Sequence, residues 1–571
     1  MRTRGLRSEN NDPVAARLSR RQFLGAAGAG LAAAGVAACS AKSYNTGGTG
    51  SSGSGGAHVA SGPPGPGPVS GGAYGGTVSV NWVSEANSLD PIIGYNTTAW
   101  DALTSLLNTP LYQFTGQFGP AAPALAAALP EVTDGGLRYV IKLRPGAKFS
   151  TGREIVADDY VYSWTRVLNP KLASWASSYL TPVVGSGPVI NGKSSTLTGV
   201  KALDDHTVEV RLEQPTFTFL NTLAQPYMAA VPREVVEKVG AEFGTHPTST
   251  GPFILHSYSR SAQSATFERN PHYAWKGLPY LGRVNYHWGV NEQLQLLQLE
   301  QGNVEIIGDG IGATLAAQVQ AESNLTKYVD RFPVNATAWI QLNCASGPLA
   351  DARVRQALNW ATDRAAVTKV AHGVYKASGY PLPSNLTEFT RTAQPFGYDP
   401  ARARSLLAQA GVKKLQMGFV TDGSDPWAEI AQVLQQQWAA FGVHLTIDTM
   451  SSSAYYTLTT TSPLRTQSYQ DDYYMTQPSA LDLIIPNFTS GGSYNYSGFK
   501  NATVDSLTTQ AEQQTTLAKS NVYVAKIEEE LVADPPAVFL ADIGFLAGRS
   551  PKLRNFQYRG ETGSYYGRMW M

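Results

Sequence analysis

Few groups of residues in this sequence have the types and spacing that catalysis or metal binding requires. The eight histidines never recur at i, i+4, the spacing that places two imidazoles on one helical face. The sequence has no G-x-S-x-G nucleophile elbow and no H-E-x-x-H zinc motif. We therefore expect a protein without catalytic residues, metal or cofactor, although a site assembled in space needs no local motif.

Cys39 is the residue whose surroundings indicate a covalent modification. Two adjacent arginines at 20–21 precede a weakly apolar run, rich in Ala and Gly, that continues to residue 38. A basic region, a short apolar core and small residues before a cleavage point are typical of an export signal, here of the twin-arginine type. Residues 36–39, V-A-A-C, resemble the box at which a bacterial lipoprotein is cleaved and lipidated. We expect Cys39 to anchor the mature chain to the outer face of the cytoplasmic membrane.

The segment after Cys39 separates this anchor from a large body. Residues 40–76 are mostly Gly, Ser and Pro, a composition that forms a flexible tether. The remaining chain of about 495 residues exceeds what one hydrophobic core usually holds, so two or three lobes are expected. If Cys39 carries lipid, Cys344 has no disulfide partner, and we expect it to be a small buried residue.

Charge excludes some classes of partner. The formal net charge is +1 and only 15% of the residues are charged, which gives no basic surface for nucleic acid or for anionic lipid. We expect the membrane to be contacted through the lipid anchor only.

The elements that must position a binding site are typical of an α/β protein. Residues 415–449 show alternation, then apolar residues at helical spacing, then alternation again, which predicts a strand–helix–strand unit. A helix is expected near 351–371, and another in which Asp399 is the N-cap and Pro400 the first residue. Further strands are predicted at 77–83, 138–143 and 207–212. Ligands of α/β proteins bind in crevices beyond the strand ends.

Several segments of the chain resemble the peptide-type extracellular solute-binding proteins of ABC importers, family 5. The segment 143–170 resembles the family's L-R-x-G-x-K-F-x-x-G run followed by a D-x-V-Y-S helix, and 249–281 resembles G-T-G-P-Y followed by E-R-N-P-x-Y-W. Segments 75–91, 349–364 and 494–507 match in the same order. Segments 169–180 and 199–210 are similar to its oligopeptide-binding members.

The resemblance implies a two-lobed periplasmic-binding-protein-like fold (type II, large three-domain variant) with a ligand cleft between the lobes. It assigns the segments as follows: 1–38, signal peptide; 39–76, lipidated Cys and tether; 77–118, 247–334 and 549–571, lobe I; 119–246, an extra domain of lobe I; 335–548, lobe II.

The resemblance also implies which residues contact a ligand. A peptide would lie extended, with its backbone paired to the loop Ile93-Gly94-Tyr95 and its α-amine on an aspartate of the segment 468–473, S-Y-Q-D-D-Y. Asp472 is the matching aspartate and Asp471 the alternative. The other matched positions are Tyr469 for a tryptophan, Trp175 and Trp339 for tyrosines, Asp309 for an asparagine and Gln341 for a glutamate.

The function implied is capture of peptides, by backbone and amine, and their delivery to the transmembrane subunits of an ABC permease by a monomeric protein. Two alternatives stay open. A member of the same family could bind a non-peptide ligand, such as a metal chelate, an opine or an oligosaccharide. The chain could also be an exported enzyme or an adhesin.

Overall fold

The computed structural model describes residues 67–115, 119–386, 389–461, 467–559 and 563–571. The predicted export signal, Cys39 and most of the predicted tether lie outside these residues. No helix within the described ranges is both long and apolar enough to span a bilayer.

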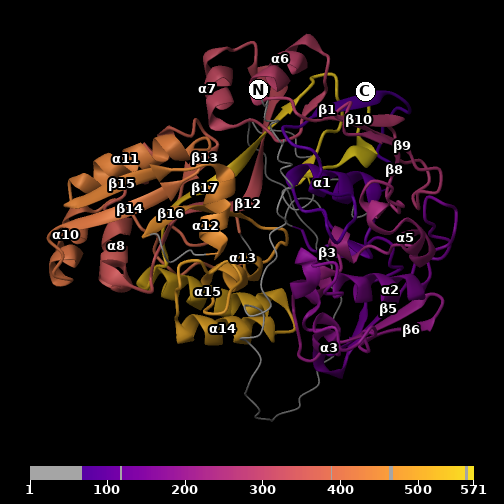
Figure 1. Cartoon of the computed structure of the whole chain (residues 1–571), viewed down its shortest axis with the longest axis horizontal. Helices are drawn as coiled ribbons and strands as arrows, with labels where there is room; N and C mark the ends of the chain where they lie inside the picture. Colours follow the sequence, from indigo (N-terminus) through magenta and orange to yellow (C-terminus); the bar gives the residue numbers. More distant parts are fainter. Residues whose placement is uncertain (1–66, 116–118, 387–388, 462–466, 560–562) are drawn as a thin grey trace, which may run out of the picture. The chain divides into compact units, whose positions relative to one another are not determined.

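An 11-stranded mixed sheet forms the centre of the fold (Figure 1). Its strand order is β15-β14-β16-β12-β17-β11-β1-β10-β9-β8, and β13 pairs with β17. We call β11, β1, β10, β9 and β8 the first half and β15, β14 and β16 the second half. The strands are β1 (Thr77–Asn81), β8 (Phe253–Ser259), β9 (Ser264–Arg269), β10 (Arg283–His287), β11 (Ile306–Ile307), β12 (Val329–Leu342), β13 (Tyr375–Ala377), β14 (Leu415–Thr421), β15 (Val443–Thr449), β16 (Ser468–Tyr474) and β17 (Ala537–Arg549).

Strands β12 and β17 join the two halves of the sheet. Residues Val329–Pro333 of β12 pair with Gly544–Gly548 of β17, and β17 continues to β11 in the first half. Further along, Ala336–Leu342 of β12 pairs with β16 in the second half. The register between β12 and β17 shifts between Pro333 and Thr337, and such an irregularity bends and twists a strand pair. The two halves are thus connected through one irregular pair of long strands.

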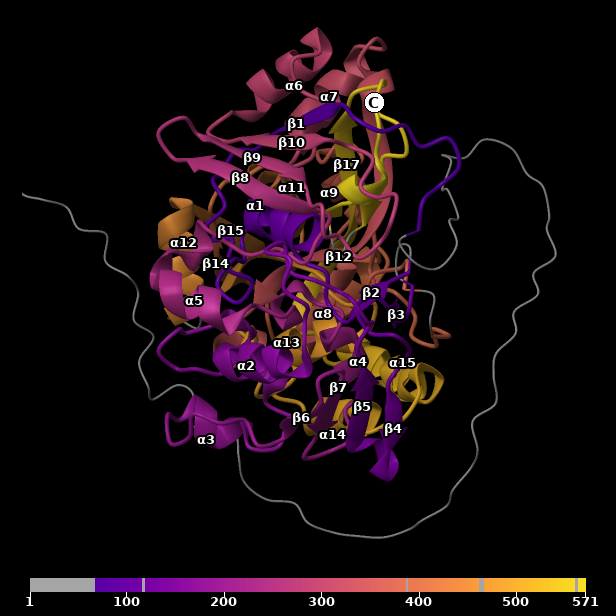
Figure 2. The ribbon, with the colours of Figure 1, turned by 90° about the vertical axis from the view of Figure 1, so that its right-hand side faces the viewer.

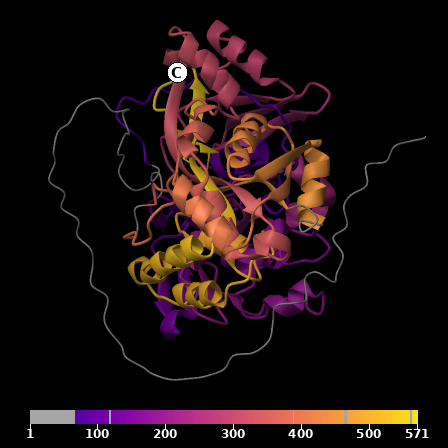
Figure 3. The same cartoon turned by 90° about the vertical axis from the view of Figure 1, so that its left-hand side faces the viewer.

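Alternation along β12 explains the two cores that cover the second half (Figure 3). Ala338 and Ile340 pack with the helices α8 (Ala352–Trp360), α10 (Pro400–Gln409) and α11 (Trp427–Ala439). Trp339 points to the other face and packs with α13 (Leu481–Phe488), α14 (Ala502–Glu512) and α15 (Leu517–Ala533). A side-chain period of two places neighbouring residues of one strand on opposite faces.

A separate four-stranded antiparallel sheet is formed by residues that lie between β1 and β8 in the chain (Figure 2). Its order is β4-β5-β7-β6, with bounds Glu131–Thr133, Arg138–Lys142, Thr207–Arg211 and Val200–Asp204. Tyr160 and Trp164 of α2 (Ala157–Val167) are fully buried in its core, together with apolar residues of the hairpin β2–β3 (Tyr112–Phe114 and Ala121–Pro123). This segment therefore has a hydrophobic core of its own.

The other α-helices of the described residues are α1 (Thr97–Ala102), α3 (Ser186–Ile190), α4 (Phe219–Thr222), α5 (Arg233–Val239), α6 (Glu292–Gln301), α7 (Ala313–Ala321), α9 (Arg364–Lys369) and α12 (Ser452–Thr461).

Most elements predicted from the sequence are confirmed. Strand β14, helix α11 and strand β15 form the predicted unit with parallel strands, and β1, β5 and β7 match the other three predicted strands. Asp399 accepts a hydrogen bond from the Arg402 amide at 2.9 Å, as expected of an N-cap.

Two details differ from the prediction. The helix expected over 351–371 is two helices, α8 and α9, because Asp363 caps a new helix through the amides of Ala365 and Ala366. Cys344 is free but only half-buried, with its thiol beside the carbonyl groups of Leu342 and Pro536.

Candidate functional site

Three parallel strands of the second half end at one edge of the sheet. Strand β14 pairs in parallel with β15 and with β16, so their carboxyl ends lie together. Asp422 directly follows β14, and Asp471 and Asp472 lie in the last half of β16. Crevices beyond the carboxyl ends of parallel strands are the usual ligand positions of α/β proteins. We call these three carboxylates the acidic edge.

Asp471 and Asp472 lie on opposite faces of the sheet. Asp471 pairs with Trp339 of β12 and Asp472 with Ala338, which contribute to different cores. Asp471 is half-buried, whereas the side chain of Asp472 is exposed. The amide of Asp472 donates a hydrogen bond to Oδ1 of Asp471 at 3.0 Å. Of the two, Asp472 is therefore the carboxylate that a solute can reach.

Protein atoms surround Asp472 although its side chain is exposed. Desolvation, with the negative charge of Asp422, raises the pKa of Asp472 to about 6. Desolvation and the charge of Asp472 raise the pKa of Asp471 well above its usual value. Among the described residues, no Lys, Arg or His contributes to either pKa. The described residues thus supply no cation to the acidic edge, and a bound cation would stabilise the ionised carboxylates.

Asp422 supplies a fixed negative charge. Its Oδ1 accepts hydrogen bonds from Ser424 Oγ at 2.6 Å and from Gln470 Nε2 at 2.7 Å, and Oδ2 accepts one from Ser452 Oγ at 3.3 Å. Burial opposes ionisation, but these hydrogen bonds outweigh it and lower the pKa of Asp422. The group next to Asp472 therefore stays ionised at neutral pH.

Tyrosines enclose the exposed face of the acidic edge. Desolvation first, and then the charge of Asp472, raises the pKa values of Tyr375, Tyr456 and Tyr474. Tyr456 is 62% exposed and Tyr474 is 50% exposed. A carboxylate beside accessible aromatic rings is suited to a cation, which both the charge and the ring faces attract.

Trp339, Gln341 and Tyr469 are in the core. The exposed fractions of Trp339 and Gln341 are 0% and 1%, and the indole Nε1 of Trp339 donates a hydrogen bond to Oε1 of Gln341. Tyr469 is buried beside Tyr455, at 6.5 Å between ring centroids. All three lie on the Asp471 face of the sheet, and direct ligand contact would require them to become accessible. Their contact with a ligand stays a prediction.

The loop Ile93-Gly94-Tyr95 presents an exposed aromatic ring. The amides of Ile93 and Gly94 both donate to the carbonyl of Asp90, at 3.0 and 2.8 Å, and the amide of Tyr95 donates to Oδ1 of Asn87 at 3.0 Å. The Tyr95 side chain is 67% exposed. In this structure the three amides are already hydrogen-bonded within the loop, so a ligand would have to meet other groups of it.

Trp175 belongs to an aromatic cluster of the four-stranded domain. Its ring lies 5.9 Å from Trp100, 6.2 Å from Tyr179 and 5.1 Å from Tyr227, between ring centroids. Its indole Nε1 is buried and has no hydrogen-bond partner among the described residues.

Asp309 follows β11 at the edge where β1 also ends. Its Oδ2 accepts a hydrogen bond from the Val83 amide at 2.7 Å. Desolvation raises its pKa, although hydrogen bonds from the Val83 amide and the Gln295 side chain oppose the increase. The structure thus brings Asp471, Asp472 and Tyr469 together on β16. Asp309 and the loop 93–95 are elsewhere in the fold: Asp309 follows β11, and the loop follows β1 in the chain.

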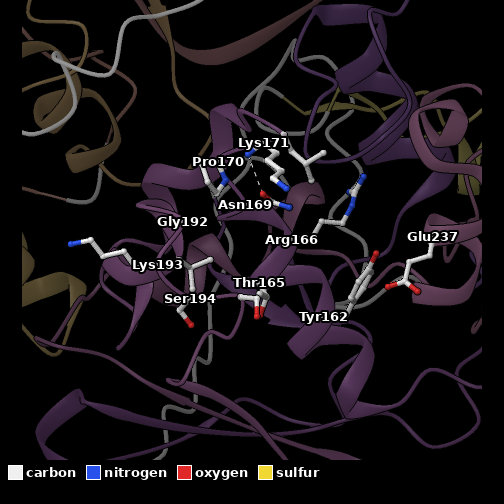
Figure 4. Close-up of a pocket in the computed structure, with 13 residues that line it drawn as sticks. Tyr162, Thr165, Arg166, Asn169, Pro170, Lys171, Gly192, Lys193, Ser194 and Glu237 are labelled. Carbon is white, nitrogen blue, oxygen red and sulfur yellow. Dashed lines mark hydrogen bonds between the residues drawn. The ribbon is translucent and has the colours of Figure 1, made fainter.

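A surface cavity of about 550 Å³ lies elsewhere, between α2, α5 and the loop after α3 (Figure 4). Residues 187–194, G-P-V-I-N-G-K-S, contribute to its lining and match the phosphate-loop pattern G-x-x-x-x-G-K-[ST]. The amides of residues 191–194 donate to carbonyls within this segment, and the segment contains α3 instead of opening a helix after a strand. The match therefore lacks the amides and the context of a phosphate loop. No group of three or more His, Cys, Asp or Glu suited to a metal occurs within the described residues.

Sequence reasoning missed Asp422 and the surrounding tyrosines. The position of Asp422, directly after a predicted parallel strand, was a usable signal. Tyr375 and Tyr456 come from other elements, and no local pattern of the sequence connects them with Asp472.

The family model "Bacterial extracellular solute-binding proteins, family 5 Middle" matches residues 121–495, about two thirds of the chain. The chain is 28% identical over 472 residues to the probable deoxycholate-binding periplasmic protein YgiS of Escherichia coli (strain K12), covering 80% of this chain and 86% of that protein. It is also 28% identical over 487 residues to the dipeptide-binding protein of Lactococcus lactis subsp. cremoris (strain MG1363), covering 78% and 86%.

A solved structure shows the same fold. The ABC transporter-associated periplasmic binding protein DppA from Helicobacter pylori, in complex with peptide STSA, superimposes with a TM-score of 0.73 at 19% identity, covering 87% of this chain and 98% of that one. The mixed α/β fold expected from the resemblance is confirmed. With the family model matching most of the sequence, the chain belongs to the bacterial extracellular solute-binding proteins, family 5.

Proposed function

We propose that this protein binds peptides through their free amino terminus, outside the cytoplasm, and delivers them to the transmembrane subunits of an ABC permease. The observation that carries the proposal is Asp472: an exposed carboxylate, surrounded by protein, next to the ionised Asp422 and without a cationic neighbour among the described residues. Asp471 is the weaker candidate because it is less exposed and its pKa is raised further.

The charge of the site favours an ammonium group over an anion. An ammonium group that loses water needs a carboxylate partner, because a buried unpaired charge is costly. An anionic solute, such as a carboxylate-rich chelate or a bile acid, would instead be repelled by the acidic edge. The dipeptide-binding relative and the peptide complex of the structural neighbour support a peptide ligand.

Attachment to the membrane is part of the proposal. The V-A-A-C segment at 36–39 supports lipidation of Cys39, and the Gly/Ser/Pro-rich residues 40–76 support a tether. Two or more acyl chains on one cysteine give durable anchoring. A tethered protein stays near its permease, so each loaded molecule meets it at a high local concentration.

Native mass spectrometry of the purified protein, followed by denaturation and identification of any released solute, tests the proposal. We expect peptides with free amino termini. Calorimetry with Ala-Ala-Ala and with its N-acetylated form provides the second test. A co-purified sugar, chelate or bile acid, together with equal affinity for the two tripeptides, would contradict a peptide ligand.

A further inference from the structure

Asp482 is a second carboxylate that has no cationic partner within the part of the chain that the structure describes. It lies in the first turn of α13, and its Oδ2 accepts hydrogen bonds from the Thr476 amide at 2.7 Å and the Gln477 amide at 3.2 Å. Burial raises its pKa to about 6, and no Lys, Arg or His among the described residues contributes. These hydrogen bonds use Oδ2 and not Oδ1.

Four tyrosines from two parts of the chain lie close enough to this carboxylate for its charge to act on them. Tyr179 and Tyr227 belong to the core of the four-stranded domain and lie 5.0 Å apart between ring centroids. Tyr473 and Tyr494 come from the second half of the large sheet and the segment after α13, with centroids 6.2 Å apart. The charge of Asp482 contributes to the raised pKa of each, after desolvation, so all four hydroxyls lie within its electrostatic reach.

Hydrogen bonds hold the two parts together at this place. Gln225 Nε2 donates to the carbonyl of Thr476 at 2.8 Å, and the amide of Phe217 donates to the carbonyl of Glu512 at 3.0 Å. The amide of Thr476 also donates a hydrogen bond to Asp482. Thr476 is therefore bonded both to this carboxylate and to Gln225 of the four-stranded domain.

Two buried polar groups at this place make no hydrogen bond of ordinary geometry with the described residues. Tyr227 is 1% exposed, and the Gln477 side chain is close enough to its hydroxyl to act on its pKa as a hydrogen-bond partner. The buried indole Nε1 of Trp175, whose ring lies 5.1 Å from that of Tyr227, is the second such group. Buried polar groups are normally hydrogen-bonded, so unpaired ones beside an unpaired carboxylate indicate a ligand. Tyr494 is 46% exposed, so the cluster reaches the surface at this residue.

We propose that Asp482, Tyr179, Tyr227, Tyr473 and Tyr494 form a second cation site, which takes the ammonium or guanidinium group of a basic side chain of the bound peptide. This inference rests on the proposed peptide function. The carboxylate pairs with the cation, and the tyrosine faces attract it further. Tyr473 follows Asp472 in β16 but pairs with Thr337 on the opposite face, so the two cation sites are separate.

Calorimetry with a peptide series tests this site. The series consists of Ala-Ala-Ala and of tripeptides in which one residue is replaced by lysine or by the uncharged norleucine. At one position we expect lysine to bind about tenfold or more tightly than norleucine, a preference that Asp482→Asn reduces to less than about threefold. Affinity for Ala-Ala-Ala should not change in this variant.

Three further variants make the test specific. Asp448→Asn changes an exposed aspartate of β15 and should keep the lysine preference. Asp472→Asn should weaken all peptides and also keep it. Tyr494→Leu removes an aromatic ring at an exposed position and should lower the lysine preference about threefold. This variant tests the site even if Asp482→Asn does not fold.

The outcomes separate this inference from the proposed function. If Ala-Ala-Ala binds and lysine and norleucine peptides bind equally at every position, the second cation site is wrong and the peptide function stands. A lysine preference that survives both Asp482→Asn and Tyr494→Leu also overturns it. If no peptide of the series binds the wild-type protein, both are wrong.

Discussion

Asp425 caps a helix of another part of the fold: its Oδ2 accepts a hydrogen bond from the amide of Thr314 at 2.8 Å. Thr314 is the second residue of α7, whose N-cap, Gly312, has no side chain that could accept it. A Cβ at position 312 would lie 3.0 Å from the same carboxylate oxygen, which explains the small residue. Asp425, in the loop after β14 of the second half, thus acts as a side-chain cap of α7, the helix that follows β11 of the first half.

We expect Asp425→Ala to lower the free energy of unfolding by about 1 kcal/mol, as for the loss of a helix N-cap. Urea unfolding of the variant measures it, with Asp448→Ala as the control at an exposed aspartate. Equal stability of the two variants would show that the contact does not stabilise the protein in solution.

Asp472→Asn keeps the shape of the side chain and removes its charge. Loss of one partner of a desolvated charge pair costs about 2–5 kcal/mol, so we expect Ala-Ala-Ala to bind tens-fold more weakly or worse. N-acetylation of the peptide should have a similar effect on the wild type, and the two changes together should cost less than their sum. Calorimetry measures this cycle. Full additivity would place the amine away from Asp472, with Asp471 the next residue to test.

Amine binding should depend on pH. Because the pKa of Asp472 is raised to about 6 in the free protein, its carboxyl is mostly protonated at pH 5 and ionised at pH 7.5. Affinity for Ala-Ala-Ala should therefore fall about tenfold from pH 7.5 to pH 5, and the fall should disappear in Asp472→Asn. The same decrease in the variant would assign it to another group.

The buried carboxyl of Asp101 should make stability depend on pH in the opposite sense. It accepts hydrogen bonds from the Ser564 amide at 2.8 Å and the hydroxyls of Tyr286 and Tyr566 at 2.5 and 2.8 Å. Burial outweighs these and raises its pKa from 3.8 to about 6. A folded-state pKa above the unfolded one favours the protonated form, so this contribution is present below pH 4 and is lost as pH rises through 6.

The shift corresponds to about 3 kcal/mol between these limits. Asp101→Asn should remove it, so the difference in free energy of unfolding between variant and wild type should move in favour of the variant as pH rises from 4 to 7. Urea titrations at both pH values measure that difference. Parallel curves would contradict the assignment to Asp101.

Cys39→Ser should release the protein from membranes, because the thioether to the lipid requires the sulfur. Fractionation of cells that produce the variant and the wild type measures the membrane-bound share. A Ser variant that stays fully membrane-bound would overturn lipidation at Cys39.

The sequence predicted the strands, the helices and the family, but only part of the site. Periodicity identified β14, α11 and β15 because each has a single apolar pattern over several residues. It did not indicate that Trp339 and Gln341 are buried, since polar Asn335, Thr337 and Gln341 alternate with apolar residues, a pattern typical of a half-exposed strand. In the structure this part of β12 is buried on both faces. Matching to the family found the pair Asp471–Asp472, and the strand pairing then showed which one is exposed.

Asp482 could not be found from the sequence. It is an ordinary residue of a short helix there, and its environment depends on Tyr179 and Tyr227, which are far away in the chain. These residues come together only after the four-stranded domain has packed against the segment that follows β16.

The last residues of the chain complete the core that the first strand begins. Val78 and Val80 of β1 pack in one cluster with Leu553, Tyr566 and Met569, and Ser564 binds Asp101 of α1. This core therefore cannot close before residues 553–569 have been synthesised. A premature stop before Leu553 would leave the apolar face of β1 without these partners and exposed to chaperones and proteases.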